Sequence, residues 1–168
     1  MIQLRGPVWW RLLLWLPIPI LIVVIVPWWL GRVAPRADRM SWGLWQWLGV
    51  WLILNGMSLV AWCVGLFVIK GQGTPLPLDP PRRFVVSGPY RYVRNPMLLG
   101  MWLILVGEVA LFASWAAAGY TVAIMLLGHL VVTYWEEPEL ARRFGEPYRQ
   151  YQRLVPRWIP RHSMKKSA

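Results

Sequence analysis

The chain has 168 residues, of which 57% are hydrophobic and only 15% are charged. This composition excludes an ordinary soluble domain, in which about 25% of residues are charged. A net charge of +11 could suggest nucleic acid, but the charges lie between and after long apolar runs. The sequence therefore predicts one membrane domain over residues 1–168, with the lipid bilayer and not nucleic acid as its partner.

Two apolar runs in the N-terminal part, residues 1–80, are long enough to cross a bilayer, which takes about 20 residues. The first covers residues 8–30 and contains three prolines, which a helical bundle tolerates. It lacks the small-residue cleavage site of a signal peptide. The second covers residues 42–69. It holds Cys63, the only cysteine, so no disulfide within the chain is expected.

Residues 70–95 form a long polar loop before the third apolar run, residues 96–113. Asn95 is a good N-cap and Pro96 a good first helical residue. A turn near Ser114 leads into the fourth run, residues 115–135, so these two runs are expected to form a helical hairpin. Gly100 and Gly107 share a face, as close contact with another helix requires.

The chain after residue 135 becomes polar and amphipathic. Pro138 is expected to start a new helix, and Pro147 another. In the second of these helices, Tyr148 and Tyr151 lie on one side and basic residues on the other, which suits the membrane interface. Residues 161–168 form a basic tail.

Basic residues are strongly biased to one side of this arrangement. Four spans place both termini and the long loop together, and that side carries 15 of the 18 Lys and Arg residues. The positive-inside rule then puts both termini in the cytoplasm of a multi-pass inner-membrane protein. The predicted fold is all-α and polytopic, with about four transmembrane helices, the C-terminal hairpin and cytosolic amphipathic helices.

The hairpin returns the chain to the membrane face that it left, so two polar segments meet there. The first contributes Tyr90, Arg91, Tyr92, Arg94 and Asn95, and the second contributes Glu136, Glu137, Glu139, Arg142 and Tyr148. Arginine suits a carboxylate, glutamate an amine and tyrosine a flat ring, so these residues could hold a zwitterion. Taken singly, each also has a simpler role as a helix cap, lipid contact or interface anchor.

Two polar residues fall inside the predicted spans. Glu108 lies in the third, where an ionisable side chain suggests function by default, although packing near the outer side is the favoured interpretation. His129 lies in the fourth, either behind the polar site or in a hydrogen bond between helices. Neither histidine belongs to a metal-ligand cluster, so no metal is expected. The sequence has no phosphate-binding loop and no dinucleotide fingerprint.

The pattern as a whole resembles the isoprenylcysteine carboxyl methyltransferase family, which is related to the membrane phospholipid methyltransferases. The resemblance covers residues 81–160 and rests on Gly-Pro-Tyr-Arg-Tyr-Val-Arg-Asn-Pro-Met-Leu-Leu-Gly at 88–100, then Glu136-Glu137, Leu140, Phe144-Gly145, Tyr148, Tyr151 and Val155-Pro156-Arg157. It implies that residues 81–160 form a methyltransferase-like core with a cytosolic pocket for S-adenosylmethionine.

Carried onto this chain, the resemblance gives roles to individual residues. Arg94 would orient a carboxylate acceptor, and Glu137 would be the base for an amine. The cofactor would lie between Tyr90, Asn95, Pro96 and Leu99 on one side and Glu136, Tyr148 and Tyr151 on the other. Asn95 stands where members acting on isoprenylcysteine commonly have histidine.

The implied function is methyl transfer to a lipophilic acceptor, whose reacting group is a carboxylate, an amine or a thiol. The alternative is a non-catalytic membrane protein that binds a lipid or small molecule on the same scaffold. Intact Arg94 and Glu136-Glu137 favour the enzyme.

Overall fold

The computed structural model describes residues 16–33, 42–71 and 84–160. Within these ranges every regular element is a helix and no strand occurs, which confirms the all-α prediction. The start of the first predicted span, the middle of the long loop and the basic tail lie outside the described residues.

The helices follow the apolar runs closely. The first described helix is α2 (Pro17–Ile20), the π turn η1 (Leu21–Ile25) and α3 (Val26–Val33), followed by α4 (Leu44–Leu66) with the π turn η2 (Phe67–Gly71). The short 3-10 helix η3 (Gly88–Arg91) precedes α5 (Pro96–Phe112). The chain then forms α6 (Trp115–Val131), the π turn η4 (Val132–Glu136), α7 (Glu137–Phe144) and α8 (Glu146–Leu154).

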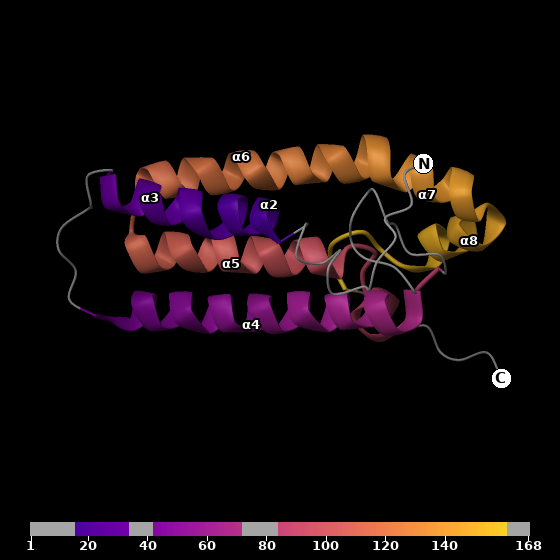
Figure 1. The fold of residues 1–168 in the computed structure, drawn as a ribbon, viewed down its shortest axis with the longest axis horizontal. Helices are drawn as coiled ribbons and strands as arrows, with labels where there is room; N and C mark the ends of the chain where they lie inside the picture. The colour runs from indigo at the N-terminus through magenta and orange to yellow at the C-terminus, as the bar shows by residue number, and fades with distance from the viewer. Residues whose placement is uncertain (1–15, 34–41, 72–83, 161–168) are drawn as a thin grey trace.

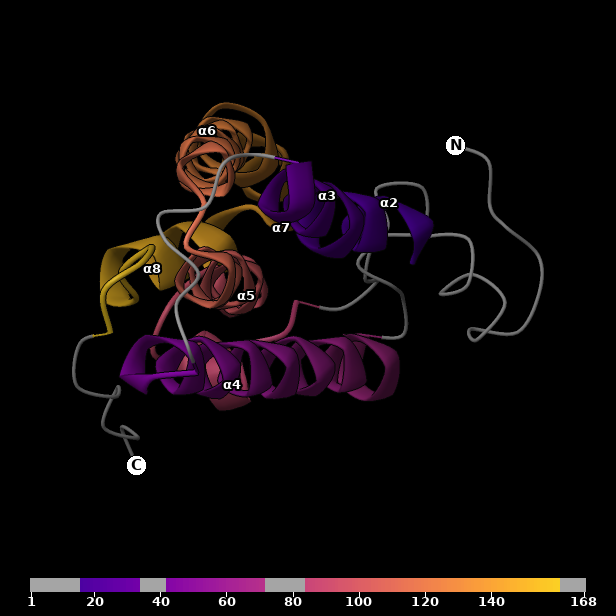
Figure 2. The ribbon, with the colours of Figure 1, turned by 90° about the vertical axis from the view of Figure 1, so that its left-hand side faces the viewer.

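α5 is the central helix of the bundle. Figures 1 and 2 show it between α4 on one side and α6 with α2 and α3 on the other. α5 runs antiparallel to both α4 and α6. Consequently η3, the beginning of α5, α7 and α8 all lie at one end of the bundle (Figure 1).

Two helices are long and apolar enough to cross a membrane: Leu44–Gly71 with 28 residues and Trp115–Phe144 with 30. Two shorter helices among the described residues, Pro17–Arg32 and Pro96–Phe112, are also apolar. Large apolar side chains on their outer surfaces are exposed, as lipid contact requires, among them Trp51, Leu54, Met57, Val122 and Leu126. These helices fit a membrane protein, and the count of four spans stays a prediction.

Glycines bring α4 and α5 into close contact. A Cβ atom added at Gly56 would lie 2.5 Å from the carbonyl oxygen of Gly100, and one at Gly49 would lie 2.6 Å from that of Gly107. The expectation that Gly100 and Gly107 face another helix is confirmed, and their partners are Gly56 and Gly49. Backbones can approach this closely only where neither residue carries a side chain.

A hydrogen bond from α6 compensates for a proline in the first helix. In the π turn η1 the N–H of Val26 donates to Leu21 O, so Ile22 O would need the N–H of residue 27. That residue is Pro27, which has none. The hydroxyl of Tyr120 donates to Ile22 O instead, at 2.8 Å, and thereby ties α6 to the first helix.

Tyr120→Phe is expected to lower the free energy of unfolding by about 1–2 kcal/mol, because it leaves Ile22 O without a donor in an apolar bundle. Thermal unfolding in one detergent measures the change. Tyr134→Phe is the matched control, because that side chain is 76% exposed. Equal effects of the two substitutions would contradict a role for the hydrogen bond.

The helix that begins at Trp115 continues through Pro138. We expected Pro138 to start a new helix, and this is wrong: the helical segments run without a break to Phe144. The π turn η4 precedes the proline, and there the N–H of Glu137 donates to Val132 O. This wider turn accommodates the missing N–H of Pro138 without ending the helix.

Candidate functional site

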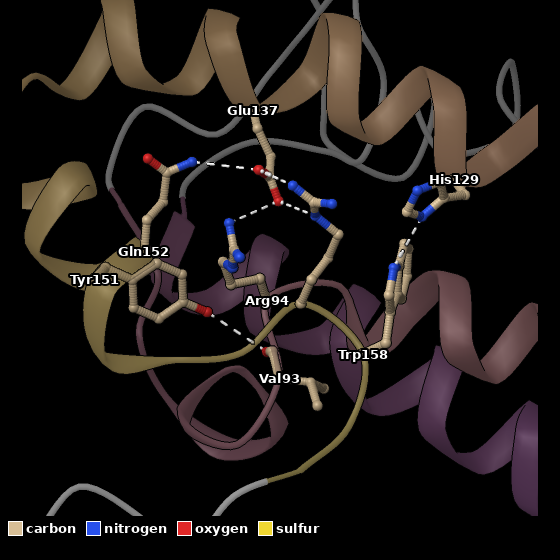
Figure 3. Close-up of polar contacts among 8 residues, drawn as sticks. Val93, Arg94, His129, Glu137, Tyr151, Gln152 and Trp158 are labelled. Carbon is tan, nitrogen blue, oxygen red and sulfur yellow. Dashed lines mark hydrogen bonds and ion pairs between the residues drawn. The ribbon is translucent and has the colours of Figure 1, made fainter.

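The candidate site lies where η3 and the start of α5 meet the end of η4, α7 and α8 (Figures 1 and 3). Local signals in the sequence build this junction. Pro89 and Gly88, at a φ of +58°, shape the turn of η3, and Pro96 is buried at the first position of α5. Gly145, at a φ of +62°, separates α7 from α8.

Glu137 is the centre of a cluster of charged side chains (Figure 3). Glu137 is only 5% exposed to solvent. Its Oε1 accepts hydrogen bonds from Arg94 NH1 and Arg157 Nε, both at 2.8 Å. Its Oε2 accepts from Arg157 NH2 at 2.8 Å and from Gln152 Nε2 at 3.3 Å. Arg157 thus binds the carboxylate through two parallel bonds, the strongest arrangement for this pair.

The cluster has more positive than negative charge and one unused donor. Two guanidinium groups face a single carboxylate, so the three side chains carry a net charge of +1. Arg94 Nε is buried and has no hydrogen-bond acceptor, and Ser87 Oγ nearby in the chain is likewise buried without a partner. Because a buried donor without an acceptor is costly, the arrangement suits an added anionic group.

Aromatic side chains join the two halves of the site. Phe84 lies 5.4 Å from Phe144, 5.5 Å from Tyr148 and 5.0 Å from Tyr151, measured between ring centroids. The hydroxyl of Tyr151 donates to Tyr90 O at 2.6 Å. Burial in this cluster raises the pKa of Tyr148 and of Tyr151. The cluster therefore holds α8 against the segment that leads into α5.

Tyr90 links the site to α4. Its ring centroid lies 5.4 Å from that of Phe67, in the π turn η2 that ends this helix. Burial raises the pKa of Tyr90 strongly. Cys63, on α4, is fully buried and is thus a packing residue.

Alkaline pH is expected to destabilise the protein steeply. Tyr90, Tyr148 and Tyr151 stay protonated in the folded state above pH 10, whereas the unfolded chain releases these protons near that pH. The stability that these raised pKa values contribute is therefore fully present below pH 10. Above pH 10 it falls by about 1.4 kcal/mol per pH unit for each tyrosine.

Tyr148→Phe keeps the aromatic contact and removes one ionisable group, so the slope should fall by a third. Unfolding midpoints measured between pH 9 and 11 test this, with Tyr92→Phe, at a 46% exposed position, as the control. An unchanged slope would contradict burial of an ionisable Tyr148.

The structure places the predicted site residues in three groups. Arg94 and Glu137 are in direct contact. Tyr90, Pro96, Tyr148 and Tyr151 are buried and form the walls of the junction. Asn95 and Leu99 are partly buried, whereas Glu136 is exposed and takes no part in the hydrogen bonds of the cluster. Asn95 has the N-cap position, but its side chain caps no N–H of α5.

Three further residues belong to the site, although no site role was predicted for them: Gln152, Arg157 and Trp158. The sequence signal for Arg157 was its place in Val155-Pro156-Arg157, part of the motif on which the family resemblance rests. Trp158 Nε1 donates to His129 Nδ1 at 3.0 Å, so His129 contacts the C-terminal segment. Glu108, in contrast, is buried in α5 with no hydrogen-bond partner for its Oε2.

Comparison with known proteins identifies the family of the chain. Residues 44–147, more than half of the chain, match the family model for phospholipid methyltransferases. No curated protein and no solved structure matches the chain. The matched residues contain Arg94, Glu137 and the whole of α4 to α7. The chain therefore belongs to the phospholipid methyltransferase family, a member of the isoprenylcysteine carboxyl methyltransferase-like group.

Proposed function

We propose that the protein is an integral membrane methyltransferase that uses S-adenosylmethionine and acts on a lipophilic acceptor. The observation that carries this proposal is the Arg94–Glu137 contact, in which two residues 43 positions apart meet at one end of an apolar bundle. The family match points to methyl transfer, and the apolar helices point to a membrane-dissolved acceptor.

The polar groups of the site fit S-adenosylmethionine. The cofactor has a carboxylate, and Arg94 Nε is a buried donor without an acceptor. It also has a flat base, which suits a junction rich in tyrosine. When bound, it would supply an electrophilic methyl group on its sulfonium. Arg94, Asn95 and Leu99 are the proposed contacts on the α5 side, and Glu136 is the proposed contact on the α6 side.

The buried tyrosines have a different role in this proposal. Tyr148 and Tyr151 hold α8 in place, and Tyr90 ties the junction to α4. Together with Pro96 they form the rigid wall against which the ligand lies. A preorganised wall of this kind fixes the geometry between donor and acceptor, which is the main task in a direct transfer.

The contacts of Glu137 favour positioning over proton transfer. Both of its oxygens already accept hydrogen bonds, including three from guanidinium groups. A carboxylate in this arrangement holds Arg94 in one orientation and has little capacity left to take a proton from an acceptor. An acceptor that needs no base, such as a carboxylate, is therefore the better fit, with an amine or thiol as the other possible reacting groups.

We also propose the membrane arrangement that the sequence predicts. Four spans with both termini in the cytoplasm place the site at the cytoplasmic face of the inner membrane. The unequal distribution of Lys and Arg supports this orientation. On the outer surface of α6 and α7, an open groove of about 410 Å³ is lined by Leu130, Val131, Tyr134, Trp135 and Arg142, a set of side chains suited to contact with lipid.

Transfer of labelled methyl groups from S-adenosylmethionine to membrane lipids tests this proposal. We expect product with the purified protein, and a loss of at least about tenfold with Arg94→Lys, because lysine lacks the planar donor fork. Arg91→Lys is the control, because Arg91 is exposed in the adjoining turn. Cofactor binding without transfer to any lipid would instead favour the non-catalytic binding protein.

A further inference from the structure

The segment after α8 crosses the candidate site and contacts Arg94, Glu137 and α6. We call Val155–Trp158 the C-terminal strap. It lies beyond residues 44–147, the part that matches the family model. Val155 is 1% exposed, so the strap begins from a fixed point in the aromatic cluster.

Consecutive residues of the strap make different contacts. The carbonyl oxygen of Pro156 accepts a hydrogen bond from the backbone N–H of Arg94 at 2.9 Å. Arg157 binds both oxygens of Glu137. Trp158 donates to His129 Nδ1 at 3.0 Å, and its ring lies 4.4 Å from that of Trp102. The strap thus connects Arg94 at the start of α5, His129 of α6 and the carboxylate of Glu137 (Figure 3).

The geometry points to His129 and Trp158 as positioning residues of the site. Trp158 is attached next to Arg157, so the bond to His129 fixes where the strap lies on the hairpin. This in turn sets the positions of the Arg157 guanidinium and of the Pro156 carbonyl. Arg94 is then held twice, through its side chain by Glu137 and through its backbone by Pro156.

The orientation of the bond defines the state of His129. Nδ1 accepts from the indole N–H, so it carries no proton, and the proton of the neutral ring is on Nε2. The Trp158 ring is held by this bond to the imidazole and by its contact with the Trp102 ring. Removal of either partner therefore loosens the strap without changing Arg94 or Glu137 directly.

Only the expected effect on cofactor binding rests on the proposed function. If the strap positions Arg94, a looser strap lowers the fraction of molecules whose site can bind. One hydrogen bond changes that equilibrium by about fivefold. The backbone N–H of Arg94 reports the same equilibrium directly, because its acceptor is an atom of the strap.

Hydrogen exchange of the Arg94 amide in the full-length protein tests the inference. Trp158→Phe keeps a ring on Trp102 and loses the N–H donor, and His129→Ala removes the acceptor. Each is expected to speed Arg94 exchange about fivefold, and the double variant by the same factor, since both remove one interaction. His129→Asn, which restores an acceptor near the Nδ1 position, should exchange like the wild type.

Two further measurements complete the test. Trp115→Phe is the matched control, because Trp115 is 82% exposed at the other end of α6, and it should leave Arg94 exchange unchanged. Calorimetric titration should show S-adenosylmethionine binding weakened by up to the same fivefold in Trp158→Phe and His129→Ala, with the unfolding temperature little altered.

Unchanged Arg94 exchange in both single variants, or effects that multiply in the double variant, would overturn the inference. If the wild type binds no cofactor, the proposed function fails, and the exchange rates of Arg94 still decide whether His129 and Trp158 hold the strap.

Discussion

Replacing Glu137 by glutamine is expected to lower the free energy of unfolding by about 3 kcal/mol or more and to weaken cofactor binding by at least about tenfold. Glu137 is the one carboxylate between two guanidinium groups that are 14% and 25% exposed at their side chains. Removing its charge leaves two like charges close together and largely shielded from water, the costly result of breaking a buried ion pair. Thermal unfolding and calorimetric titration measure the two effects.

Glu139→Gln is the matched control for this substitution. Glu139 lies two residues further along α7 and pairs with Arg142, but the two side chains are 49% and 75% exposed. Such a surface pair contributes little, so the change should stay within about 0.5 kcal/mol. If the two variants lost the same stability, the burial of Glu137 could not be the reason that its ion pairs stabilise the protein. The interpretation of the cluster would then be wrong.

Gly56→Ala should destabilise the bundle by about 2–3 kcal/mol, although alanine is a better helix former than glycine. Its new Cβ would lie 2.5 Å from the carbonyl oxygen of Gly100 and 2.7 Å from a side-chain carbon of Ile104. The backbones of α4 and α5 must separate to make room, and contacts along the whole seam weaken. Thermal unfolding in detergent measures the loss.

The opposite sign is expected nine residues further along the same helix. A Cβ at Gly65 would meet no atom within 4 Å, so Gly65→Ala should stabilise α4 by up to about 1 kcal/mol through helix propensity. A stabilising effect at both positions would mean that the α4–α5 backbones are not in close contact.

The beginning and end of α5 and the start of α6 were predictable because short-range signals determine them. Pro96 has the first position of α5, as expected. Ser114 caps α6 by accepting a hydrogen bond from the N–H of Ala117 at 3.4 Å. These signals act within one turn of helix, so they can be read from neighbouring residues.

The course of the chain at Pro138 could not be predicted in the same way. A proline two residues after a polar boundary usually marks a helix start. Here η4 widens the preceding turn, and α7 keeps its contacts with the aromatic cluster through Leu140, Ala141 and Phe144. Packing between distant segments therefore overrode the local signal.

The site shows the same division between local and distant information. The sequence predicted that Arg94 and Glu137 meet, because the two apolar runs between them were expected to return the chain to the same end, and the two side chains are in contact. It named Arg157 only as part of the family motif and did not place Arg157 or Trp158 at the site, because their contacts depend on the turn of the chain after α8. Nor did it identify Gly49 and Gly56, because the partners of Gly100 and Gly107 follow only from how α4 lies against α5.

The most direct test of the account is a calorimetric titration of purified, folded protein with S-adenosylmethionine and S-adenosylhomocysteine in the presence of lipid. We expect one site per chain with affinity in the micromolar range, and much weaker binding to Glu137→Gln than to Glu139→Gln. Absence of binding to the folded wild type would contradict the methyltransferase proposal and leave a membrane protein that shares the family's scaffold.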